Sequence, residues 1–70
     1  MLQLEETAVS LDEFEALRLC DYENLEQVEA GEKMGVSRGT IQRLLYKGRA
    51  KIVEAILSNK SLHIHLKEKV

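Results

Sequence analysis

Apolar residues recur at helical spacing along most of the chain, most clearly between Arg38 and Leu57. At about 100° per residue, one stripe of this segment is apolar and the opposite side is polar. The stripe consists of Ile41, Leu44, Leu45, Gly48, Ile52, Ala55 and Ile56. The pattern predicts a helix over 38–57 that packs along one side. Val53 and Leu57 lie on its outer side, so we expect another element to cover that end.

A shorter helix is predicted over residues 11–20. Ser10 stands where it can cap this helix, and Glu13 stands where a capping box closes. The residues expected in the core are Leu11, Phe14 and Leu17, and those expected to face water are Asp12, Glu13 and Glu15.

The second helix is predicted over residues 26–34. Its cap is weak, because Glu26 stands where Ser or Thr would serve better. Gly35 follows at a position that favours a left-handed residue, and Ser37 can cap the next helix. The residues available to the core are Leu25, Val28, Ala30 and Met34.

The two ends of the chain alternate between apolar and polar residues. Residues 62–66 do so strictly, as a half-buried strand does, and residues 2–4 do so more briefly. The two segments could pair and lie on the helices or on a second copy of the chain. The fold predicted over residues 1–70 is therefore a single all-α, three-helix domain of the helix-turn-helix type, with a long third helix and short terminal β-strands.

Length and composition exclude several classes of protein. The small core of a seventy-residue chain supplies only ~3 to 5 kcal/mol of net stability, so a large enclosed active site is not expected. We find no catalytic constellation and expect neither an enzyme nor a cofactor. One cysteine forms no intramolecular disulfide, and His63 and His65 alone make an incomplete metal site. No stretch has the length of a membrane span or the pattern of a signal peptide, which favours the cytoplasm.

Acidic and basic residues are distributed unevenly along the chain, which adds a prediction about binding. The net charge is −2, yet residues 1–32 hold ten carboxylates and one Arg, and residues 33–70 hold nine cations and two carboxylates. Six of the nineteen residues from 33 to 51 are cationic and none is acidic. Such polarity predicts a face that binds a polyanion.

The same region has the spacing of a helix-turn-helix, in which the second helix of the motif enters the major groove. The close crossing of two short helices requires small residues, which Ala30 and Gly31 supply, and Gly35 makes the turn. Val36 is expected to fill the space under the turn, with Ile41 and Leu44 anchoring the third helix. The alternative is an ordinary helical hairpin with a solvated basic face.

Residues 9–57 resemble a family of small prokaryotic proteins that are similar to the C-terminal, promoter-reading domain of sigma factors. The matching stretches are Leu11-Asp12-Glu13-Phe14-Glu15-Ala16-Leu17-Arg18-Leu19, Glu29-Ala30-Gly31-Glu32-Lys33-Met34-Gly35-Val36-Ser37-Arg38-Gly39-Thr40 and Arg49-Ala50-Lys51-Ile52. The resemblance implies a role in transcription. Gly31 and Gly48 stand where the family more usually has Ala, which would weaken both helices by ~1 kcal/mol each.

Ten residues on and before the third helix are candidates for DNA contact. Arg43 suits guanine O6 and N7, and Gln42 suits adenine N6 and N7, the alternatives being a phosphate contact or a solvated side chain. The other candidates are Ser37, Arg38, Gly39, Thr40, Tyr46, Lys47, Arg49 and Lys51. We expect the lysines and Arg49 to attract phosphate, and Tyr46 either to contact phosphate or to pack in the core.

The sequence therefore predicts sequence-specific binding of double-stranded DNA and transcription regulation, by a homodimer held by the terminal strands and the end of the third helix. The acidic part of the chain could contact RNA polymerase. The alternative function is a protein-interaction module, in which the basic helix docks on an acidic partner such as a polymerase or a sigma-associated factor.

Overall fold

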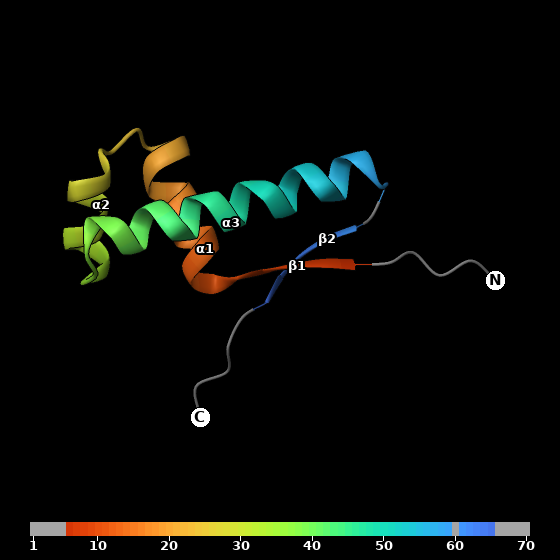
Figure 1. Ribbon diagram of the computed structural model, residues 1–70, viewed down its shortest axis with the longest axis horizontal. Coiled ribbons are helices and arrows are strands. Elements are labelled where there is room, and N and C mark those ends of the chain that lie inside the picture. The colour runs from red at the N-terminus through yellow and green to blue at the C-terminus, as the bar shows by residue number, and fades with distance from the viewer. Residues whose placement is uncertain (1–5, 60, 66–70) are drawn as a thin grey trace, which may run out of the picture.

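The computed structural model describes residues 6–59 and 61–65, and the side chains of Glu6, Ser61, His63 and His65 lie outside the description. The fold is all-α and helix-turn-helix-like, as predicted. Its elements are β1 (Glu6–Ser10), α1 (Leu11–Leu17), the π-helix η1 (Arg18–Tyr22), α2 (Gln27–Met34), α3 (Arg38–Leu57) and β2 (Ser61–His65). Helices α1, η1 and α2 gather around the first part of α3, and the two strands lie beside its second part (Figure 1).

Helix α1 begins as predicted and ends differently. The Glu13 N–H donates to Ser10 Oγ (3.1 Å) and the Ser10 N–H donates to Glu13 Oε1 (3.0 Å), which closes the capping box. The helix was expected to end at residue 20. Instead it widens after Leu17 into η1, where the Glu23 N–H donates to the carbonyl of Arg18 at 2.9 Å. Because of this π-helical hydrogen bond, which spans five residues, the helical segment extends to Tyr22.

The turn between α2 and α3 has the predicted geometry. Helix α2 starts one residue later than expected because Glu26 is its N-cap, and the Glu26 N–H donates to the Glu29 carboxylate at 3.0 Å. Gly35 is left-handed (φ 73°). Ser37 then caps α3, accepting from the Thr40 N–H at 3.2 Å, and α3 has the predicted bounds.

Gly31 is necessary for this turn. Its carbonyl accepts from the Val36 N–H at 2.9 Å, and a Cβ at position 31 would lie 2.6 Å from the Val36 carbonyl oxygen. Backbone atoms cannot move aside as a side chain can, so the crossing of α2 and α3 requires glycine here. The prediction that Gly31 is one of the small residues needed at the crossing is confirmed, and the cost expected for a glycine in α2 is the cost of that close approach.

The core lies where α1, η1 and α2 meet the inner side of α3. Its buried members are Ala16, Leu17, Leu19, Ala30, Ile41 and Leu45. Five residues expected inside are exposed instead, namely Leu11, Phe14, Val28, Val36 and Ile56. Helix α1 turns its Glu13 and Ala16 side to α3, because Gly48 lets it approach closely: a Cβ there would lie 2.9 Å from Leu17 Cδ1.

The terminal strands pair in parallel, with Ala8 opposite His63 and Val9 opposite Ile64. Parallel strands need a long crossover, and the helices provide it. The strand expected over 2–4 and the last residue of 62–66 lie outside the described residues. The strand at 6–10 was not predicted, because its buried side carries Thr7 and Val9. A threonine on the buried side weakens the alternation of apolar and polar residues that marks a strand.

Candidate nucleic-acid interface

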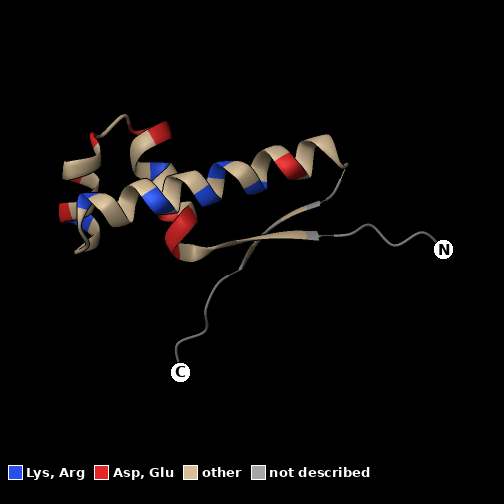
Figure 2. Cartoon of the chain, viewed as in Figure 1, with Lys and Arg blue, Asp and Glu red and all other residues tan. Residues whose placement is uncertain are grey.

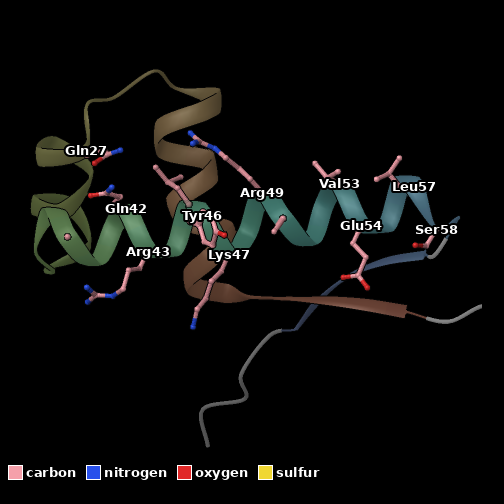
Figure 3. A pocket seen from close by; sticks show the side chains of 13 residues that line it. Gln27, Gln42, Arg43, Tyr46, Lys47, Arg49, Val53, Glu54, Leu57 and Ser58 are labelled. Carbon is pink, nitrogen blue, oxygen red and sulfur yellow. The ribbon is translucent and has the colours of Figure 1, made fainter.

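The exposed face of α3 forms an open groove that also borders α2 (Figure 3). Six of the ten predicted contact residues line it, namely Gly39, Gln42, Arg43, Tyr46, Lys47 and Arg49. Ser37, Arg38, Thr40 and Lys51 do not line it. Tyr46 is 77% exposed, so its packing in the core is excluded.

Arg43 is held toward the start of α3 by a short chain of hydroxyl groups. Its Nη2 donates to Thr40 Oγ1 at 3.2 Å, and Thr40 Oγ1 lies 3.1 Å from Ser37 Oγ. A guanidinium has five N–H donors, and one of them is used here. The remaining donors are available to a ligand in front of the helix.

The first half of α3 carries positive charge that no nearby carboxylate neutralises. Arg38, Arg43 and Lys47 form no ion pair among the described residues. Basic residues occur along this half without an acidic one, whereas most acidic residues lie on or between α1, η1 and α2, and Glu54 lies in the second half of α3 (Figure 2). In Figure 3, Arg43 and Lys47 extend from one flank of the helix, where they would meet an anion together.

Arg49 lines the groove, but its charge is already paired. Its Nε and Nη2 donate to the two carboxylate oxygens of Asp21 at 3.0 and 2.6 Å. The hydrogen bond from Arg49 lowers the pKa of Asp21, so the pair remains charged near neutral pH. A phosphate must therefore compete with Asp21 for this guanidinium.

Lys51 is directed away from the groove. Its Nζ donates to Glu13 Oε1 at 2.8 Å. Burial raises the pKa of Glu13, but hydrogen bonds from Lys51 and Ser10 outweigh burial and lower it overall. Glu13 is buried, contrary to the expectation that it faces water, because it bonds both the start of α1 and a lysine of α3.

Gln27 is a groove residue that sequence reasoning missed. It occupies the first position of α2 and lines the groove with Gln42 (Figure 3). Its Oε1 is buried and has no hydrogen-bond partner among the described residues. The sequence feature that could have identified Gln27 is its position at the start of the first helix of the motif. In this class, that helix crosses the DNA backbone.

The sequence also led to expectations about a membrane span and a metal site. Within residues 6–59 and 61–65, no helix is long and apolar enough to cross a membrane. The same residues contain no cluster of three side chains suited to a metal ion. The side chains of His63 and His65 lie outside the description.

The fold and groove define a small helical domain of the helix-turn-helix-like class. The family model described as "Protein of unknown function DUF134" matches residues 2–68, and the chain belongs to this family. It is 51% identical over 61 residues to a UPF0251 protein of Chloroherpeton thalassium, covering 87% of this chain and 40% of that protein.

Other relatives match to a similar degree. A UPF0251 protein of Aeromonas salmonicida is 50% identical over 89% of this chain and 61% of its own length. One of Pyrococcus furiosus is 52% identical over 80% of this chain and 52% of its own. The chain thus spans about half the length of the curated relatives it matches. No solved structure matches it.

Proposed function

We propose that this chain binds double-stranded DNA in the cytoplasm through the exposed face of α3 and regulates transcription from a promoter element. The observation that carries the proposal is the position of Arg43 and Lys47. Both lie on the second helix of a helix-turn-helix-like unit and have no carboxylate partner within the described residues. A solvated cationic flank on that helix suits the major groove and its phosphate borders.

The groove residues divide by chemistry into those that read bases and those that position the protein. The planar fork of Arg43 matches guanine O6 and N7, and the Gln42 amide matches adenine N6 and N7. Lys47 is a flexible point charge that attracts phosphate. Tyr46 has a hydroxyl that can bond phosphate at the rim. Arg49 contributes less, because it is paired with Asp21.

The test begins with selection of bound sites from a random duplex library, followed by anisotropy titration of the selected and the scrambled duplex at fixed salt. Arg43→Ala should cost ~1 to 3 kcal/mol on the selected site and less on the scrambled one. Arg43→Lys is the matched control, because it keeps the charge and loses the fork. It should retain binding to scrambled DNA and lose preference at one base.

Three outcomes would contradict the proposal. A chain that enriches no site from the library is not a sequence-specific reader. Equal losses for Arg43→Ala on both duplexes would remove the base-reading role and leave only attraction to phosphate. A chain that binds no duplex at low salt, but binds an acidic protein such as a polymerase subunit, would instead be a protein-interaction module.

A further inference from the structure

Among the predicted contact residues, Thr40 has a hydroxyl group that contacts two other side chains. It lies in the first turn of α3 and does not line the groove. Its Oγ1 accepts from Arg43 Nη2 at 3.2 Å and lies 3.1 Å from Ser37 Oγ. Its backbone N–H donates to the same Ser37 oxygen at 3.2 Å. The shortest route from Thr40 to a ligand in the groove therefore runs through Arg43.

The position of the Thr40 hydroxyl is restricted in two ways. Threonine is β-branched, so few χ1 conformations are open to it in a helix. Ser37 is the N-cap of α3, and its hydroxyl oxygen is held by the backbone N–H of Thr40. Arg43 follows Thr40 by three residues, a spacing that makes two side chains neighbours on a helix surface. The two hydroxyl groups thus form a fixed acceptor for a long side chain that is otherwise flexible.

The bond to Thr40 limits how Arg43 can present its donors. A guanidinium carries five N–H groups in a planar fork, and two of its edges offer a pair of parallel donors. One edge joins Nη1 to Nη2 and the other joins Nε to Nη2, so each pair uses one N–H of Nη2. The bond from Nη2 to Thr40 occupies one of these edges. A single paired edge then remains for guanine O6 and N7, and Thr40 selects which one.

We propose that Thr40 is a positioning residue for base recognition, which acts on DNA through Arg43 and orients the guanidinium before the duplex binds. This inference rests on the proposed function. A side chain that is ordered in advance loses less conformational entropy on binding. Attraction to phosphate carries no sequence information and does not need a particular edge of the fork. Thr40 should therefore affect the preference for one base and leave general affinity for DNA unchanged.

Thr40→Val tests this role, because valine keeps the branched shape and removes the acceptor. Thr40→Ser is the matched control, because it keeps the hydroxyl group. At the base where Arg43→Lys loses preference, Thr40→Val should lower the preference about two- to tenfold, and Thr40→Ser should retain it. The salt dependence of binding should be equal in the two variants, because the cations are unchanged. In an Arg43→Lys background, Thr40→Val should cause no further loss of preference.

A second measurement requires no DNA. NMR relaxation of the arginine Nε–H groups in the free chain reports how firmly each guanidinium is held. Arg38 is the internal reference, because its side chain has no hydrogen bond or ion pair with any other described residue. The Arg43 group should be more restricted than that of Arg38 in the unmodified chain and in Thr40→Ser. It should become as mobile as that of Arg38 in Thr40→Val, with equal helix content by circular dichroism.

Three results would overturn the inference. The first is an Arg43 group that is equally mobile in the unmodified chain and in Thr40→Val, because the bond would then hold nothing. The second is an unchanged base preference in Thr40→Val. The third is a loss of preference that persists in the Arg43→Lys background, because Thr40 would then contact the duplex itself. If Thr40 restrains Arg43 but the chain enriches no duplex, the restraint is confirmed and the proposed function fails.

Discussion

The two halves of α3 belong to one continuous helix but present different chemistry to their surroundings. The first half packs against α1 and α2, and its outer face carries Gln42, Arg43 and Lys47. The second half is contacted by β1 and β2, and its outer face carries Val53 and Leu57. The groove extends over both halves. One helix thus carries a cationic outer face in its first half and an apolar outer face in its second half, along the same groove.

The halves also differ in how firmly they are fixed. Near the first half, the capped turn and the close crossing at Gly31 determine where α3 begins and how it is oriented. Beside the second half lies a sheet of two strands, a unit that is only marginally stable by itself. We therefore expect changes around the turn to cost more stability than changes beside the strands.

The largest effect is expected from Gly31→Ala. The new Cβ would lie 2.6 Å from the Val36 carbonyl oxygen, so the backbone must shift, at a cost of about 3 kcal/mol. Gly48→Ala is the control, because its Cβ would meet a side chain, Leu17, at 2.9 Å. The helix propensity gained, ~1 kcal/mol, should offset most of that strain. Urea unfolding of both variants measures the difference, and equal stability would refute the close crossing.

A smaller effect on stability is expected from replacing Glu13, and this effect should depend on pH. Its pKa is lower in the folded chain, so the stability it contributes is present above about pH 4 and is lost as the pH falls through the folded pKa. Glu13→Gln should lower stability at pH 7 by ~1 to 3 kcal/mol and reduce the loss between pH 7 and pH 3. The exposed Glu32→Gln serves as the control. An unchanged pH dependence for Glu13→Gln would exclude the Lys51 and Ser10 bonds as its cause.

The smallest effect on stability is expected from Asp21→Asn. The pair with Arg49 is exposed on both sides, and such pairs contribute at most ~1 kcal/mol. Its effect on DNA should be larger, because Arg49 becomes available to phosphate and the salt slope should steepen by about 0.9. Titrations at several salt concentrations measure this slope. A slope equal to that of the unmodified chain would mean that Arg49 does not reach the duplex.

Much of the fold could be predicted because its signals are local. Ser10, Gly35 and Ser37 act on backbone groups within three residues, and the helical period of α3 is carried by its own sequence. The face that α1 buries could not be predicted in this way. It depends on Lys51, which is 38 positions away from Glu13 in the sequence.

The candidate site likewise has features that could be predicted from local sequence and others that could not. The periodicity of α3 placed Gln42, Arg43 and Lys47 on its exposed face. It could not show that Arg49 and Lys51 are paired with carboxylates of η1 and α1, because long-range ion pairs leave no periodic pattern. A count of cations therefore overstates the charge available to DNA.

We expect duplex DNA to contact α3 mainly through Gln42, Arg43, Tyr46 and Lys47 in its first half, and not through Val53 or Leu57 near its end. An NMR titration of the isotope-labelled chain with a selected duplex distinguishes these two parts of α3. The amide signals of Gln42, Arg43, Tyr46 and Lys47 should shift in proportion to bound duplex, while those of Val53 and Leu57 should not respond to DNA. Shifts confined to the second half, or to α2 without α3, would contradict this expectation.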